Sequence, residues 1–326
     1  MIRLIWLFVT LALAQMPSWP REAESPMTPK PAAAPPATLG YLGEFGDEST
    51  PVYVLEDHGH LVAIVGRGNP IQTTPNIFTL DRRGRATRIT IDGMSYDRRE
   101  VGPADGHQLK VTPQRPVAEL LREALTQSPP AETGTFRPAQ LVELAKLDRT
   151  IHLEIRYATT NNFLGARFYS EARAFMQRPA AEAVARAANA LKPLGYGLLI
   201  HDGYRPWFVT KTFWDATPQD KKWLVADPSK GSKHNRGCAV DLTLYDLKTG
   251  RVIAMPSTYD ESTPRAYAFY PGGTSLERWH RALLRRVMEA EGFAVNPEEW
   301  WHFDYKDWQQ YAIGNVAFDK IPPPKS

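Results

Sequence analysis

The chain has 326 residues, of which 43% are hydrophobic, 23% charged and 11% aromatic, which is the composition of a soluble globular protein with one large or two ordinary domains. Its 39 basic and 36 acidic residues give a net charge of +3 without a run of Lys and Arg, and this argues against nucleic-acid binding. The single cysteine, Cys238, excludes an intrachain disulfide, so the fold must depend on its core.

Residues 1–14 have the pattern of a secretory signal peptide. Arg3 precedes an apolar run that ends in Ala-Leu-Ala before Gln15. The run is well short of the roughly 20 residues that span a bilayer. We therefore expect an exported protein, periplasmic or extracellular, with no stable membrane span after signal removal. An uncleaved anchor is the alternative.

The next two segments differ in composition. Residues 15–38 are rich in Pro and Ala and should form an extended linker. Residues 39–112 contain short β-type runs separated by Gly and Asp turns, which predicts a small all-β domain, an antiparallel sheet or half-barrel, of unknown role. His58 and His60 could face one side of a strand and bind a metal, but no third ligand is near them, so a solvated hairpin is the better interpretation.

The remainder mixes helices and strands. Residues 113–135 should form a short helix, at 116–126, and a linker with Pro129, Pro130 and Gly134. In residues 136–322 we expect an α+β domain with an Ala-rich helix from Pro179 to Leu191 and strands at 196–200 and 239–245. The second strand should turn at 248–250 into a hairpin with 251–255. Thr274 and Glu277 form a capping-box pattern before another amphipathic helix, which ends near Gly292.

Two candidate metal ligands lie in residues 232–241. In the strand at 239–245, apolar side chains alternate with Asp241, which should face a more polar space. The small residues Gly237 and Ala239 would let the chain bend so that His234 approaches Asp241. A His nitrogen and a carboxylate oxygen suit zinc, which binds them at about 2.0–2.2 Å. A surface histidine and a strand-edge aspartate are the alternative.

A third ligand is available in residues 298–302. His302 follows Glu299 by three residues, and Trp300 and Trp301 lie between them. An ordinary aromatic core segment is the alternative, but the tryptophans should bury this stretch, and a buried Glu or His needs partners. Two His and one carboxylate with a fourth position open to water is the arrangement of a catalytic zinc.

These motifs resemble those of the D-alanyl-D-alanine dipeptidases, the VanX-like branch of the zinc D,D-peptidases. The resemblance rests on Ser-x-His-x-x-Gly-x-Ala-x-Asp at 232–241 and Glu-x-Trp-His at 299–302, and it extends through the segments 156–165, 195–199 and 202–206. It covers about residues 136–322 and nothing upstream. The resemblance implies a Hedgehog/D,D-peptidase-like zinc peptidase domain of α+β class with a central antiparallel sheet, preceded here by the small all-β domain.

The resemblance also implies roles for eight residues. One Zn²⁺ per chain would be held by His234, Asp241 and His302, and Glu299 rather than its neighbour Glu298 would be the general base. Arg205 would stabilise the polarised carbonyl, and a structural ion pair is the alternative for this residue. The dipeptide would be bound by Ser232, Asp260 and Tyr157.

The implied activity is hydrolysis of the D-alanyl-D-alanine dipeptide to free D-alanine. Export separates this chain from dipeptide destruction in the cytoplasm and favours peptidoglycan turnover or salvage. A D,D-carboxypeptidase that acts on longer muropeptides and a non-catalytic wall-binding module are the alternatives. The implied partners are the dipeptide and, as a further option, peptidoglycan.

Overall fold

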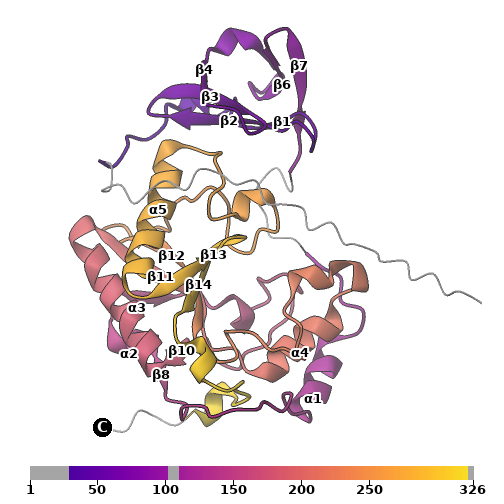
Figure 1. Ribbon diagram of the computed structural model, residues 1–326, viewed down its shortest axis with the longest axis vertical. Coiled ribbons are helices and arrows are strands. Elements are labelled where there is room, and N and C mark those ends of the chain that lie inside the picture. The colour runs from indigo at the N-terminus through magenta and orange to yellow at the C-terminus, as the bar shows by residue number, and fades with distance from the viewer. Residues whose placement is uncertain (1–28, 102–109, 322–326) are drawn as a thin grey trace, which may run out of the picture.

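The computed structural model describes residues 29–101 and 110–321, so the expected signal segment at 1–14 lies outside the described residues. A β-sheet built from the first of these ranges lies at one end of a larger α+β body built from the second (Figure 1). In the part of the chain that is described, no helix is long and apolar enough to cross a bilayer.

The N-terminal sheet has seven strands in the order β4-β3-β2-β1-β7-β6-β5, and all of its pairs are antiparallel. The expectation of a small antiparallel sheet is therefore confirmed. Its strands are β1 (Gly43–Phe45), β2 (Val52–Asp57), β3 (His60–Val65), β4 (Ile71–Thr73), β5 (Phe78–Leu80), β6 (Ala86–Ile91) and β7 (Met94–Arg99). His58 is exposed in the turn between β2 and β3, as expected for a solvated hairpin.

The larger body is organised around a five-stranded sheet in the order β13-β14-β12-β11-β9. Its strands are β9 (Ile151–Leu153), β11 (Tyr196–Asp202), β12 (Ala239–Asp246), β13 (Phe293–Asn296) and β14 (Glu299–Tyr305); β8 (Leu141–Glu143) and β10 (Phe175–Gln177) form a separate pair. The expectation of a central antiparallel sheet is confirmed in part: β11, β12, β14 and β13 pair antiparallel, but β9 pairs with β11 in parallel, so the sheet is mixed. A long connection that includes α3 separates these two strands, as a parallel pair requires.

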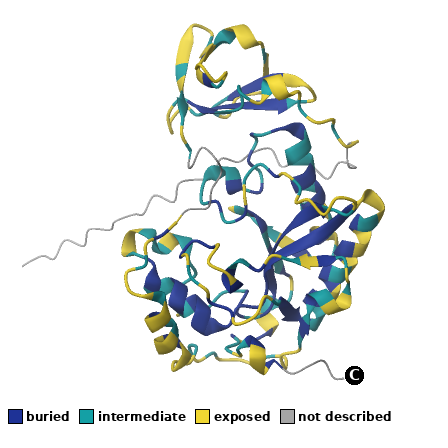
Figure 2. Ribbon diagram, turned by 180° about the vertical axis from the view of Figure 1, so that it is seen from behind, coloured by how far each residue is buried: buried dark blue, intermediate teal, exposed yellow. Residues whose placement is uncertain are grey.

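Five α-helices occur among the described residues: α1 (Val117–Leu125), α2 (Leu144–Leu147), α3 (Arg178–Leu191), α4 (Trp207–Ala216) and α5 (Ser275–Ala290). Short 3₁₀ helices lie at Pro36–Thr38, Pro75–Ile77, Arg156–Ala158, Lys192–Leu194, Gln219–Leu224, Pro264–Ala266, Trp308–Gln310 and Phe318–Lys320. α3 packs against α5 beside the sheet, and α1 packs against α4. The central strands are buried (Figure 2), so the sheet gives a rigid base for side chains at its edge.

Local sequence signals fix the ends of these helices. The Thr274 hydroxyl accepts from Glu277 N at 3.2 Å and Glu277 Oε2 accepts from Thr274 N at 2.7 Å, which confirms the capping box.

The expected hairpin at 251–255 is reduced to one bridge, between Tyr245 and Val252. Beyond this bridge the chain leaves the sheet, and Met255 lies buried in the core of the larger body.

Candidate metal centre and catalytic pocket

The two central strands bring two predicted ligands face to face. β12 and β14 pair antiparallel with Asp241 directly opposite His302. His234 reaches the same place from the turn that precedes β12. That turn needs Gly237, whose φ of +68° is in the left-handed region and whose added Cβ would come within 2.9 Å of Leu141 Cδ2.

The three side chains present one ligand atom each to a common point. Oδ1 of Asp241 lies 3.1 Å from Nδ1 of His302 and 3.5 Å from Nε2 of His234, and the two nitrogens are 3.2 Å apart. His234 and Asp241 are buried, and His302 is largely so. The cluster is the one group of three His, Cys, Asp or Glu residues with metal-ligand spacing among the described residues.

The hydrogen bonds of the outer imidazole nitrogens show that the inner nitrogens of both histidines direct their lone pairs into the cluster. His234 Nδ1 donates to the Gly203 carbonyl oxygen at 2.8 Å, and His302 Nε2 donates to Asp304 Oδ1 at 2.9 Å. In the neutral imidazoles the inner nitrogens are then acceptors, and they face Asp241 Oδ1, which has no well-formed hydrogen bond to the described residues. Three acceptors this close require a cation between them, and two imidazoles with a carboxylate fit zinc.

The pKa shifts within the cluster also indicate that it requires a positive charge. Burial lowers the pKa of His302, but the neighbouring carboxylates of Asp241 and Asp304 outweigh it and raise the pKa to about 10. Burial would raise the pKa of Asp241, yet the neighbouring His234 and His302 hold it well below its ordinary value. Without a metal, a proton compensates these acceptors. A divalent cation is the stronger substitute.

Glu299 lies beside this cluster at the start of β14. Its Oε2 accepts from Asn296 Nδ2 at 2.8 Å and lies 3.6 Å from His302 Nδ1. Removal from water raises the pKa of this carboxyl, more than the opposing His302 lowers it. A break in the β13–β14 register pairs Asn296 with Glu299, and this irregularity turns Glu299 toward the same space as His302. Glu298 is exposed, although it also borders the pocket.

Arg205 lies between β11 and α4 and is tied to the metal cluster through the backbone. Its amide donates to the His234 carbonyl at 3.0 Å, and its own carbonyl accepts from Asn235 Nδ2 at 2.8 Å. Its Nε and Nη2 bind Asp202 Oδ2 at 3.0 and 2.8 Å, so the ion pair considered as the alternative is present. Burial opposes the charge, but Asp202 outweighs it and raises the pKa of Arg205 well above its ordinary value.

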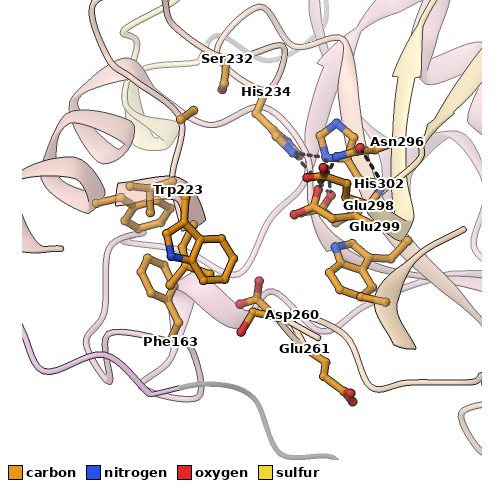
Figure 3. A pocket seen from close by; sticks show the side chains of 18 of the residues that line it. Phe163, Trp223, Ser232, His234, Asp260, Glu261, Asn296, Glu298, Glu299 and His302 are labelled. Atoms are coloured by element: carbon orange, nitrogen blue, oxygen red, sulfur yellow. Dashed lines mark hydrogen bonds and ion pairs between the residues drawn. The ribbon is translucent and has the colours of Figure 1, made fainter. Parts of the chain in front are cut away.

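All eight predicted site residues line one pocket of about 610 Å³. Asp260 points into this space across from the His234 and His302 rings, and Ser232 lies beyond His234 (Figure 3). Asp260 has a φ of +65°, an uncommon conformation for a residue other than glycine. Tyr157 is buried in an aromatic cluster, and the Arg205 guanidinium lies 5.3 Å from its ring centroid.

The sequence analysis missed three residues that orient the predicted ones: Asn296 holds Glu299, Asp304 holds His302, and Tyr259 donates to Asp241 at 3.1 Å. Asp304 had a signal, because it follows His302 by two residues on the same strand and so shares its face. Tyr259 and Asn296 gave no pattern of their own, since Tyr259 acts from a loop and Asn296 acts through the register break at the end of β13.

Comparison with known proteins agrees with this geometry. A family model described as D-ala-D-ala dipeptidase, Peptidase_M15, matches residues 137–320, more than half of the chain. The chain belongs to this family. The resemblance stated from the motifs is confirmed, and with it the assignment of the chain as a metallopeptidase of that family.

Two relatives named D-alanyl-D-alanine dipeptidase match about half of the chain each. A D-alanyl-D-alanine dipeptidase of Escherichia coli is 33% identical over 174 residues, which are 53% of this chain and 89% of the relative. A D-alanyl-D-alanine dipeptidase of Enterococcus faecalis is 34% identical over 185 residues, 49% of this chain and 90% of the relative. The N-terminal sheet, β1 to β7, precedes the residues that the family model matches.

Proposed function

We propose that this member of the family hydrolyses the D-alanyl-D-alanine dipeptide to free D-alanine with one zinc ion per chain. The observation that carries the proposal is the cluster of His234, Asp241 and His302, whose acceptor atoms lie within 4.8 Å of one another, with Glu299 in the same pocket. The relatives named D-alanyl-D-alanine dipeptidases support the choice of substrate.

The protein's own residues supply the remaining chemistry. A zinc ion at this position supplies Lewis acidity, which lowers the pKa of a coordinated water to about 7. Glu299 lies at 3.6 Å from His302 Nδ1 with a raised pKa, which suits a base that accepts a proton and passes it to the leaving amine. Arg205 carries a permanent positive charge for the oxyanion that develops on the scissile carbonyl, and Asp202 holds its guanidinium in place.

The amino group and the methyl groups of the dipeptide require different partners. The Asp260 carboxylate, which points into the pocket, suits the free amino group, and Ser232 adds a hydroxyl near His234 (Figure 3). Tyr157 forms part of the apolar wall with Phe163 and Phe213, where the alanine methyl groups can pack.

Location and cellular role follow from the N-terminal sequence. The charged and then apolar start that ends in Ala-Leu-Ala supports export to the periplasm or the outside of the cell. There the substrate would be dipeptide released from peptidoglycan, and the role would be turnover or salvage. The family match supports the finer fold proposal, a Hedgehog/D,D-peptidase-like zinc domain.

One observation favours a second candidate, a D,D-carboxypeptidase. A pocket of about 610 Å³ is in the range that holds drug-sized ligands, about 300–1,000 Å³, and Trp223 lines it while 71% exposed. Such room would accept a longer muropeptide stem.

The deciding experiment compares both substrates. Purified mature protein with bound zinc is assayed for D-alanine release from D-Ala-D-Ala and from tripeptide and pentapeptide stems that end in D-Ala-D-Ala. Release from the dipeptide with little release from the stems is expected. Cleavage of the stems with the dipeptide left intact would replace the dipeptidase with the carboxypeptidase.

A further inference from the structure

The N-terminal sheet has two buried faces. Alternate side chains of β2 and β3, Val52, Val54, Leu61 and Ala63, form the sheet's own core. The intervening ones, Tyr53, Leu55, Val62 and Ile64, form a second cluster with Tyr270, and Tyr267 packs against it. Tyr267 and Tyr270 belong to the larger body. The sheet is therefore docked on that body by an apolar face (Figure 1).

A buried carboxylate adds a specific contact to this interface. Glu56, 1% exposed, accepts from Ser275 N at 2.8 Å and from Ser275 Oγ at 2.9 Å at the first turn of α5. The positive end of the helix favours this charge. Next to it, Glu56 N donates to the Gly273 carbonyl at 3.1 Å, and Leu55 forms a parallel bridge with Gly273. Charge, helix end and strand pairing thus fix one relative position.

The segment that the sheet contacts is also a wall of the catalytic pocket. Seven residues of this segment, 260–273, line the pocket beside the metal cluster: Asp260, Glu261, Ser262, Thr263, Pro264, Ala266 and Tyr267. Tyr267 takes part in both surfaces, since it packs on the sheet cluster and borders the pocket. Ala268 N donates to the Pro297 carbonyl at 3.0 Å, which ties the segment to the loop before Glu299.

We propose that the N-terminal sheet is a positioning element of the catalytic pocket. Through Glu56 at the start of α5 and Tyr53 against Tyr270, it holds the segment 260–273 in the conformation that presents Asp260 to the substrate. The three metal ligands lie on β12, β14 and the turn before β12, outside the segment 260–273. The sheet therefore sets substrate affinity and leaves metal binding unchanged.

The family model matches residues 137–320, which begin after the sheet, so the sheet is an addition to the matched peptidase segment. An added domain that is fixed against a pocket wall can change which substrates that pocket holds. The ring centroids of Tyr53 and Tyr270 are 6.0 Å apart at 78°, an edge-to-face contact that resists sliding of the two surfaces.

The test uses the mature full-length chain with Glu56→Gln and, as a milder change from the other side of the interface, Ser275→Ala. Asp97→Asn is the matched control, because Asp97 lies on β7 of the same sheet with its side chain 72% exposed. We expect faster amide hydrogen exchange in residues 260–273 of both interface variants. We also expect KM for D-Ala-D-Ala to rise about fivefold or more, with kcat within about twofold. This kinetic expectation rests on the proposed function.

Zinc content separates this effect from loss of the site. One zinc per chain is expected in the wild type, in both interface variants and in the control. Unchanged exchange in 260–273, or faster exchange there with KM unchanged, would overturn the positioning role. If the wild type fails to cleave the dipeptide, the proposed function fails instead, and the exchange comparison with Asp97→Asn alone decides whether the sheet holds the pocket wall.

Discussion

The hydroxyl of Tyr259 donates a hydrogen bond of 3.1 Å to Oδ2 of Asp241, while Oδ1 of the same carboxylate faces the two predicted histidine ligands. The Tyr259 ring stacks on His201 with centroids 4.2 Å apart and meets the edge of Trp301 at 5.5 Å. The ring is thereby fixed, and it assigns one oxygen of Asp241 to the metal position and the other to the protein.

Tyr259→Phe should weaken zinc binding without emptying the pocket of its ring. Partners that orient a metal ligand typically contribute about 10- to 100-fold to metal affinity, and a loss at the lower end of this range is expected. The measurement is competition for zinc with a chromophoric chelator at fixed pH. The stacked contact with His201 should survive, so the thermal midpoint of the metal-free variant should match the wild type. Equal zinc affinity would show that Tyr259 does not orient Asp241.

Glu299→Gln should separate catalysis from metal binding. The three predicted ligands are untouched, so the variant should retain one zinc per chain, while loss of the base should lower kcat by about 10²- to 10⁴-fold. The neighbouring Glu298→Gln is the matched control, because Glu298 is exposed and does not belong to the metal cluster. Equal rates for Glu299→Gln and wild type would remove Glu299 from the mechanism.

Arg205→Lys tests whether Arg205 serves the reaction as well as its ion pair. A lysine can keep a charge near Asp202 but cannot hold it with two nitrogens as Arg205 does at 2.8 and 3.0 Å. If the guanidinium also stabilises the oxyanion, kcat should fall about 10²-fold or more. Steady-state kinetics and urea unfolding are compared on the same samples. Loss of stability with kcat retained would assign Arg205 to structure alone.

The predictability of the site depended on how local its signals were. The spacing of His234 and Asp241 and the alternation of β12 placed two ligands from neighbouring residues. His302 was indicated by its place three residues after Glu299 in a tryptophan-rich segment, and the family motifs agreed. That Asp241 lies directly opposite His302 is a matter of strand register, which needs the assembled sheet. Glu299 shares the face of His302 because of a register break at Asn296, and regular alternation cannot predict such a break.

The fold was predictable in its parts and less so in its assembly. The short runs with Gly and Asp turns indicated the N-terminal sheet, and the capping box marked the start of α5. The continuous apolar runs of β2 and β3 carried a further signal that both faces are buried, but which surface covers the second face depends on Tyr270, far along the chain. The parallel pairing of β9 with β11 likewise depends on how the chain crosses over between them.

Stability should fall between pH 6.5 and 4 because of buried neutral histidines. Burial lowers the pKa of His280 to about 4, helped by the charge of Lys30, whereas an unfolded histidine titrates near 6.5. Between these values the unfolded chain binds a proton that the folded chain refuses. The contribution of neutral His280 to the free energy of unfolding is therefore full above pH 6.5. It is lost as pH falls toward 4, by up to about 3 kcal/mol.

His280→Gln removes this group and keeps an acceptor or donor for the Tyr196 hydroxyl, which lies 3.0 Å from His280 Nε2. Urea unfolding at several pH values from 7.5 to 4.5 should give a free energy of unfolding that falls less steeply for the variant than for the wild type. The slope should not vanish, because burial also lowers the pKa of His201 to about 4 and that residue remains. Parallel curves for the two proteins would mean that His280 binds its proton equally well in both states, and that its burial does not make folding sensitive to acid.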